Sequence, residues 1–120
     1  MKIASVTDDG VSIHSHFGRA LYFEVVTVDD GHLTARERRT KPAHHGHQAH
    51  EATPAHAPAM AEVIGDCQIL LAPAMVESAF HALQARGINP MLVQEHAIDE
   101  AVRAYVQGGL QHRPERIHHH

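Results

Sequence analysis

Tryptophan is absent from the chain, aromatic residues make up only 4% of it, and cysteine occurs once, as Cys67. A single cysteine excludes an internal disulfide, and it also excludes a four-cysteine zinc or iron–sulfur site. The hydrophobic core must therefore be built from aliphatic residues, methionine and alanine. So few cysteines are typical of a reducing compartment, which predicts a cytoplasmic protein.

Long apolar runs and an excess of basic residues are also missing. No segment approaches the about 18 consecutive apolar residues that a membrane-spanning helix needs, and the N-terminus lacks the pattern of a signal peptide. The formal net charge is −4, so no basic surface argues for nucleic acid. We therefore expect neither a membrane nor a nucleic acid as a partner.

The length of 120 residues fits one domain, and hydrophobic residues at 43% with charged residues at 20% are ordinary for a globular protein. We expect this domain over residues 1–110, followed by a polar tail over residues 111–120. The final histidines, His118–His120, resemble part of a purification tag and are left out of the candidate site.

Five segments with the apolar and β-branched content of strands are combined with three helical patterns. The predicted strands are residues 2–7, 21–28, 32–40, 67–72 and 88–94, and the predicted helices are a short one ending near Asp66, one over 73–86 and one from Ile98 to Val106. The Asp29-Asp30-Gly31 sequence predicts a hairpin between the second and third strands. This order predicts a mixed sheet with helices on both faces, in which the second strand runs antiparallel to its neighbours.

The C-terminal ends of the parallel strands meet at one edge of such a sheet, where open α/β sheets bind their ligands. His14, His16, His96 and the segment Lys41 to Pro58 all follow strands that end at this edge. These imidazoles can therefore converge.

Other polar residues are interpreted differently. Asp8 and Asp9 follow the first strand and are interpreted as turn-forming residues. Cys67 and His32 begin their strands, so both are predicted at the opposite edge of the sheet. Cys67 is interpreted as a small core residue.

Lys41 to Pro58 carries five of the chain's 14 histidines and, apart from its prolines, no apolar residue larger than alanine. This composition predicts a flexible loop over residues 41–58 rather than a core element. Imidazole is a common ligand of transition metals, but the segment lacks the HExxH pattern of zinc hydrolases. A polar loop with adventitious metal affinity remains the alternative. The candidate metal ligands are His14, His16, His44, His45, His47 and His50.

Several motifs together carry a family resemblance over about residues 1–110. They are MKIASVTDDG at the start, IxSHFGRAxYFxVVxV from Ile13 to Val28, and IDEAVRAYVQGGL from Ile98 to Leu110. The chain resembles the dinitrogenase iron–molybdenum cofactor-binding family and is similar to NifX, NafY and the C-terminal domain of NifB, as a small stand-alone member. The resemblance implies a three-layer α/β/α fold with the ribonuclease H-like motif. Its five-stranded mixed sheet would have the order 3-2-1-4-5 with strand 2 antiparallel.

The resemblance also implies a carrier rather than an enzyme. The protein would bind and deliver an iron–sulfur, molybdenum–iron–sulfur or molybdenum–copper cluster between donor and acceptor proteins, as a monomer or weak dimer. The implied cofactor-binding residues are Ser15, His16, Phe17, Gly18 and Arg19. The chain departs from the family's glycine-rich pattern after the fourth strand, where Ala72 to Ala79 contains no glycine.

Two other functions remain to be compared with the carrier. A mononuclear zinc, nickel or copper binding or sensing module would need only the histidine-rich loop. A metal-dependent nuclease is disfavoured, because it needs several carboxylates presented from the strands, and the first and fourth predicted strands have none.

Overall fold

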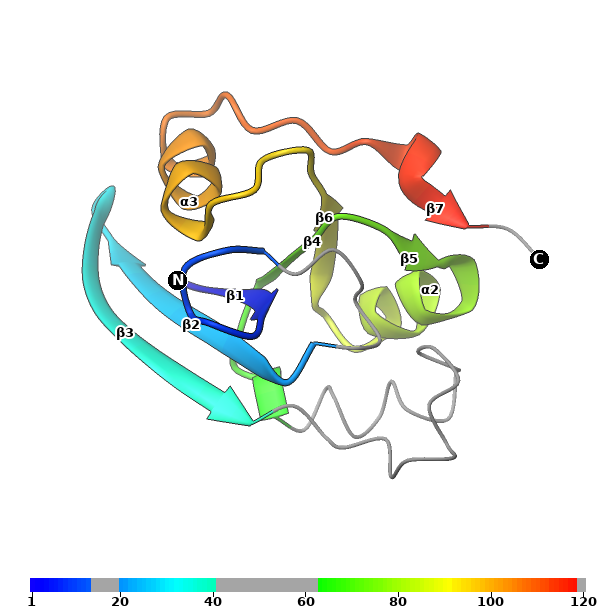
Figure 1. The fold of residues 1–120 in the computed structure, drawn as a ribbon, viewed down its shortest axis with the longest axis horizontal. Coiled ribbons are helices and arrows are strands. Elements are labelled where there is room, and N and C mark those ends of the chain that lie inside the picture. Colours follow the sequence, from blue (N-terminus) through cyan, green and yellow to red (C-terminus); the bar gives the residue numbers. More distant parts are fainter. Residues whose placement is uncertain (14–19, 41–62, 119–120) are drawn as a thin grey trace.

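The computed structural model describes residues 1–13, 20–40 and 63–118, and the elements named here lie within them (Figure 1). The main strands are β1 (Lys2–Thr7), β2 (Tyr22–Asp29), β3 (His32–Thr40), β4 (Ile69–Ala72) and β6 (Asn89–Leu92). The helices are α2 (Glu77–Ala85), α3 (Ile98–Val106) and the 3-10 turn η3 (Pro114–Arg116), and two short strands are β5 (Met75–Val76) and β7 (Ile117–His118).

The main strands form one mixed sheet in the order β3-β2-β1-β4-β6 within the described residues. β2 is antiparallel to β1 and β3, whereas β4 is parallel to β1 and β6 is parallel to β4. Counting only the strands of this sheet, the order is the predicted 3-2-1-4-5. The predicted α/β class and the antiparallel second strand are therefore confirmed.

The hairpin between β2 and β3 forms where the sequence predicts it. Asp30 and Gly31 make a two-residue turn with φ angles of 50° and 78° between the paired residues Asp29 and His32. Positive φ at both turn positions matches the right-handed twist of the flanking strands. Glycine adopts such an angle without steric cost, which explains its place at the second position.

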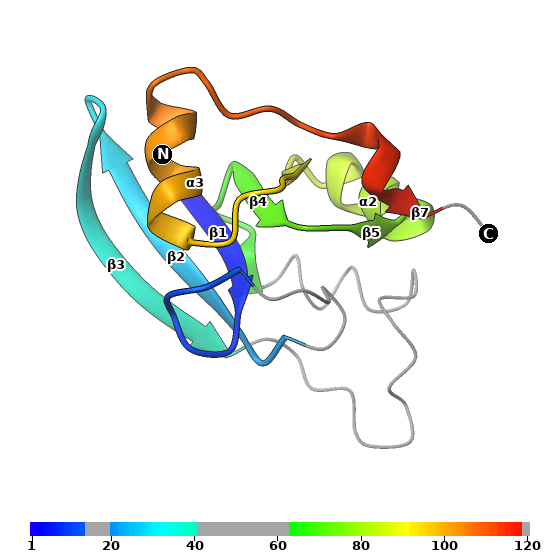
Figure 2. The ribbon, with the colours of Figure 1, turned by 45° about the horizontal axis from the view of Figure 1, so that its top comes forward.

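The helices pack on the sheet through the residues that share a helical face. α3 buries Ile98, Ala101 and Val102 against the sheet, and Figure 2 shows this helix lying across β1 and β2. α2 lies in the connection between the parallel strands β4 and β6. A right-handed connection places α2 on the face of the sheet opposite α3.

Three predicted boundaries were wrong by two or more residues, and one of them is the end of the strand predicted over residues 88–94, which ends at Leu92. The helix predicted over residues 73–86 begins only at Glu77, because Met75 and Val76 pair as β5 with β7. The strand predicted over residues 67–72 begins at Ile69. At Met75 and Val76, tertiary pairing rather than local propensity decides the backbone.

The core is mostly aliphatic, and Phe23 and Phe80 are its buried aromatic residues within the described ranges. Its largest fully buried side chains include Phe23, Leu70, Leu71, Leu83 and Ile98. No helix in the described ranges is long and apolar enough to cross a membrane.

The tail after α3 runs along the outer edge of β6. The Leu92 N–H donates to His112 Nδ1 at 3.1 Å, and the Leu92 carbonyl accepts from the Arg113 N–H at 2.8 Å. The tail then forms η3 and pairs as β7 with β5. Residues of the predicted polar tail thus form hydrogen bonds with the edge strand β6 and pair with β5.

Candidate functional site

The predicted convergence of strand ends is present in the fold. Thr7 at the end of β1 pairs with Tyr22 at the start of β2, which in turn pairs with Thr40 at the end of β3. Ile13 and Ala20 border the segment 14–19, and Thr40 borders the segment 41–62. Both segments therefore connect to the fold at the C-terminal edge of β1.

The predicted site residues lie outside the described residues, so the structure neither brings them together nor separates them. The predicted cofactor-binding residues concerned are Ser15, His16, Phe17, Gly18 and Arg19. The predicted metal ligands concerned are His14, His16, His44, His45, His47 and His50. Their roles remain predictions, and the structure describes only the residues that border these two segments.

The loop after β1 is held by its own side chains. Asp9 Oδ1 accepts from the N–H groups of Val11 and Ser12, both at 2.8 Å, and Thr7 Oγ1 accepts from the Gly10 N–H at 2.9 Å. The donors Ser12 and Val11 hold the pKa of the Asp9 carboxyl below its ordinary value of 3.8. Asp9 is thus a turn-forming residue, as predicted.

Asp8 in the same loop reaches across to β2. Its Oδ1 accepts from the Leu21 N–H at 2.8 Å. This bond joins the residues on the two sides of segment 14–19, so Asp8 has a structural role across the loop rather than the turn-forming role that the sequence predicted.

The same loop is bound to the chain that enters α3. The Ile13 N–H donates to the His96 carbonyl at 2.7 Å, and the Ile98 N–H donates to the Val11 carbonyl at 2.9 Å. These bonds place His96, whose side chain is exposed, beside the last described residue before segment 14–19. The predicted position of His96 at this edge is confirmed.

Backbone donors in this loop are already used. The N–H groups of residues 9 to 13 all donate to acceptors within the protein. An anionic cluster is often held by a concave row of such N–H groups. Residues 9–13 therefore supply a rigid frame rather than an anion cradle.

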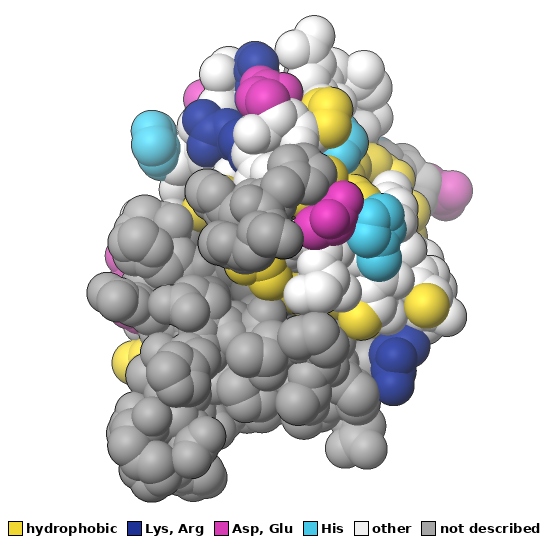
Figure 3. Space-filling view, turned by 90° about the vertical axis from the view of Figure 1, so that its right-hand side faces the viewer, with side chains coloured by type: hydrophobic (Ala, Val, Ile, Leu, Met, Phe, Trp, Pro, Cys, Tyr) yellow, Lys and Arg dark blue, Asp and Glu magenta, His cyan; other side chains and the backbone are white. Residues whose placement is uncertain are grey.

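The connection after β4 is also engaged. The Pro73 carbonyl accepts from Arg116 Nη1 at 3.2 Å, and Met75 and Val76 pair with Ile117 and His118. This is the connection in which the sequence lacks the family's glycines. The side of the molecule that carries α2, β5 and β7 shows histidine and acidic side chains among hydrophobic ones (Figure 3).

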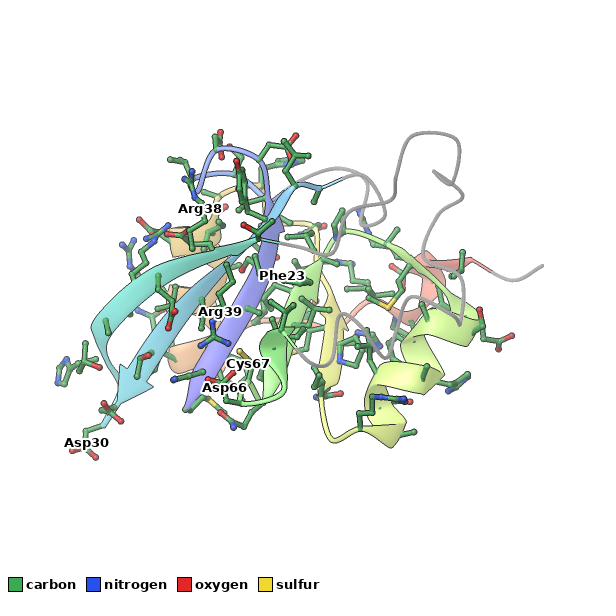
Figure 4. The ribbon with its side chains drawn as sticks, turned by 90° about the horizontal axis from the view of Figure 1, so that it is seen from below. Phe23, Asp30, Arg38, Arg39, Asp66 and Cys67 are labelled. Carbon is green, nitrogen blue, oxygen red and sulfur yellow. The ribbon has the colours of Figure 1, made fainter. Side chains whose placement is uncertain are left out.

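The opposite edge of the sheet holds Cys67, as predicted (Figure 4). Its thiol is only 2% exposed, and this burial, with nearby Asp66, raises its pKa to about 11. Arg39 forms two hydrogen bonds to the Asp66 carboxylate, at 2.6 and 2.9 Å, and Lys2 adds a third at 2.9 Å. These partners, Arg39 first, hold the pKa of Asp66 well below its usual value. Cys67 is far from the candidate edge and is protonated at neutral pH.

Sequence reasoning missed an ion-pair cluster on the face that α3 covers. The Glu24 side chain is only 10% exposed, and its carboxylate lies 2.6 Å from Arg36 Nε and 3.7 Å from Arg38 Nε. The predicted hairpin turn alone would place Glu24 opposite Glu37. A β-bulge between Thr27 and Val28 shifts the register so that Glu24 lies opposite Arg38, and the sequence pattern did not indicate this bulge. A buried carboxylate needs such partners.

Among the described residues, no three His, Cys, Asp or Glu side chains are grouped as a metal site would require. At the candidate edge, the described residues include the exposed His96 and the hydrogen-bonded loop after β1 that lies beside it.

The chain matches the family described as "Dinitrogenase iron-molybdenum cofactor" over residues 1–108, which is most of its length. The chain therefore belongs to this family, as the motifs predicted. A comparison with curated proteins finds no match.

Solved structures share the fold. The crystal structure of PH0822 superimposes with a TM-score of 0.75 at 19% identity, covering 96% of this chain and 98% of that one. The apo form of the orange protein from Desulfovibrio gigas superimposes with a TM-score of 0.70 at 24% identity, covering 94% of this chain and 92% of that one. At these identities, the likeness establishes the fold alone.

Proposed function

We propose that this protein binds a metal–sulfur cluster, with iron or molybdenum, and carries it between a donor and an acceptor protein. The observation that carries the proposal is the meeting of Thr7, Tyr22 and Thr40 in one row across the sheet. Thr40, which borders segment 41–62, belongs to that row, and Ala20, which borders segment 14–19, comes two residues before Tyr22. Membership of a family named for the iron–molybdenum cofactor supports the same cargo.

In this proposal, neutral imidazoles ligate exposed metal atoms of the cluster. His16 would supply one ligand, and one or two of His44, His45, His47 and His50 would supply the rest. Arg19 would offset part of the cluster's negative charge. Ligands on loops rather than on strands make the binding labile, which suits delivery.

The proposal describes a carrier in the cytoplasm and not an enzyme. The single cysteine supports a reducing location. β1 and β4 contain no carboxylate, so the centre of the sheet offers nothing to a two-metal nuclease.

Anaerobic reconstitution tests the cargo and its ligands together. The untagged protein is incubated with either ferrous iron and sulfide or tetrathiomolybdate, desalted, and measured by visible absorption and metal analysis. The triple variant His16→Ala, His45→Ala, His47→Ala should lose at least tenfold in affinity for the probe that wild type retains. A control variant, His32→Ala with His81→Ala, removes exposed imidazoles away from the strand ends that border the candidate edge and should bind like wild type. Wild-type binding by the triple variant would refute the ligand assignment.

A second candidate function rests on the density of imidazoles in the histidine-rich segment. His44, His45, His47 and His50 lie within seven residues, and this density favours binding of a single zinc, nickel or copper ion. Metal analysis of untagged protein purified from its own host distinguishes the two. A mononuclear metal without sulfide would support the binding or sensing module and contradict the cluster carrier.

A further inference from the structure

Arg36 on β3 joins three parts of the molecule, which are β2, the start of α3 and the loop after β1 that leads towards the candidate edge. Its Nε donates to Glu24 Oε2 on β2 at 2.6 Å, and its Nη1 donates to Asp99 Oδ1 at the start of α3 at 2.5 Å. Its Nη2 donates to the Gly10 carbonyl in the loop after β1 at 2.6 Å. One planar guanidinium thus fixes the relative positions of a strand, a helix and a loop.

Burial of Glu24 keeps Arg36 in this place. A carboxylate that is 90% removed from solvent is costly unless it is paired, and Arg36 provides its shortest ion pair. Arg36 itself lies on the surface of the sheet, with its side chain 33% exposed, so Glu24 is the buried partner of this contact.

Gly10 is suited to receive this contact. Its φ of 78° belongs to the left-handed region, and a Cβ built there would lie 2.4 Å from Arg38 Nη2. A glycine at this position lets the arginines of β3 approach the loop closely. The loop then continues through Val11 and Ser12 to Ile13, whose N–H is bound to His96.

We propose that Arg36 is a positioning residue for the proposed cluster site. By holding Gly10 against Glu24 and Asp99, it fixes the path of residues 10–13 and so the point from which segment 14–19 begins. This inference rests on the proposed function, because segment 14–19 contains the predicted ligand His16. Arg36 does not touch the cluster in this proposal.

The conservative variant Arg36→Lys separates geometry from charge. Lysine keeps the positive charge beside Glu24, but its single ammonium cannot donate in the three directions of the guanidinium fork. If only charge matters at this edge, Arg36→Lys will bind the cluster like wild type. If the geometry of the three hydrogen bonds matters, Arg36→Lys will bind the cluster more weakly than wild type.

A mildly destabilised variant provides the control. Ile88 is 1% exposed and lies just before β6, at the opposite edge of the sheet from the loop. Ile88→Val removes one buried methyl group and destabilises the protein by a modest amount without touching the ion-pair cluster. Any effect of Arg36→Lys that Ile88→Val shares is a stability effect.

The experiment has two measurements on wild type, R36K and I88V. Amide hydrogen exchange of Val11, Ser12 and Ile13 reports the loop directly, and we expect it to be about tenfold faster in R36K than in wild type and I88V. Binding of tetrathiomolybdate, and of a cluster formed from ferrous iron and sulfide, should be about tenfold weaker in R36K alone.

The outcomes distinguish this inference from the proposed function. If wild type binds neither probe, the proposed function is wrong and the role of Arg36 at such a site falls with it, while the exchange data still show whether Arg36 holds the loop. If wild type binds a probe and R36K binds it equally well, the positioning role is overturned. Equal exchange of the three amides in wild type and R36K would overturn it as well.

Discussion

The Cys67 thiol should react far more slowly with a soluble aromatic disulfide reagent in the folded protein than in the unfolded chain. The attacking species is the thiolate, and a pKa of about 11 in place of the ordinary 9.0 lowers its fraction at pH 8 about a hundredfold. Burial to 2% exposure adds a second barrier, because the reagent must wait for a local opening. The native reaction should therefore be at least a hundredfold slower.

The assay follows absorbance of the released thiolate at pH 8, in buffer and in concentrated urea. A matched control carries Cys67→Ala with Ser12→Cys, which moves the thiol to an exposed position in the loop after β1. This control should react at nearly the same rate in both solvents. A native rate for Cys67 within about threefold of the unfolded rate would refute the assignment of a buried, protonated thiol. Cys67→Ala alone should bind the cluster probes like wild type.

Three further substitutions test the fold. Asp66→Asn should lower the free energy of unfolding by about 1 kcal/mol at pH 7. Because the folded-state pKa of Asp66 lies below its ordinary 3.8, this contribution is present above that pH and is lost as the pH falls below it, so urea titrations of variant and wild type should converge there. Leu71→Ala, at a fully buried position in β4, should cost about 2–5 kcal/mol in the same titration, and a cost under about 1 kcal/mol would contradict its place in the core. Gly31→Ala should cost about 1 kcal/mol through its φ of 78°, whereas an unchanged midpoint would contradict the hairpin turn.

The elements predicted best are those whose signals are local. The turn at Asp30 and Gly31 and the helix from Ile98 to Val106 depend on residues that are neighbours in the sequence, and both match the structure. β5 and β7 were not predicted, because a two-residue strand exists only through its partner. No local pattern in Met75 and Val76 identifies that partner.

The candidate site also has one part that the sequence predicts and one part that it does not. Topology alone predicts which strand ends share an edge, and the pairing of Thr7 with Tyr22 agrees with it. The arrangement of ligands depends on segments 14–19 and 41–62, whose composition fixes residue types but not geometry. The link from Glu24 through Arg36 to Gly10 was missed because it joins three elements, and its two distances follow from packing rather than from spacing.

His112 shows that a histidine can belong to the fold rather than to a metal. Its Nδ1 accepts the Leu92 N–H at 3.1 Å, and its ring stacks on Phe80 with the centroids 5.6 Å apart. A neutral imidazole that accepts at Nδ1 carries its proton on Nε2, so this tautomer is set by the β6 backbone. A metal ion at Nδ1 would have to break that bond. The number of metal ions bound per chain should therefore not be estimated from all 14 histidines. At least one of them, His112, already uses its free ring lone pair to accept a backbone hydrogen bond.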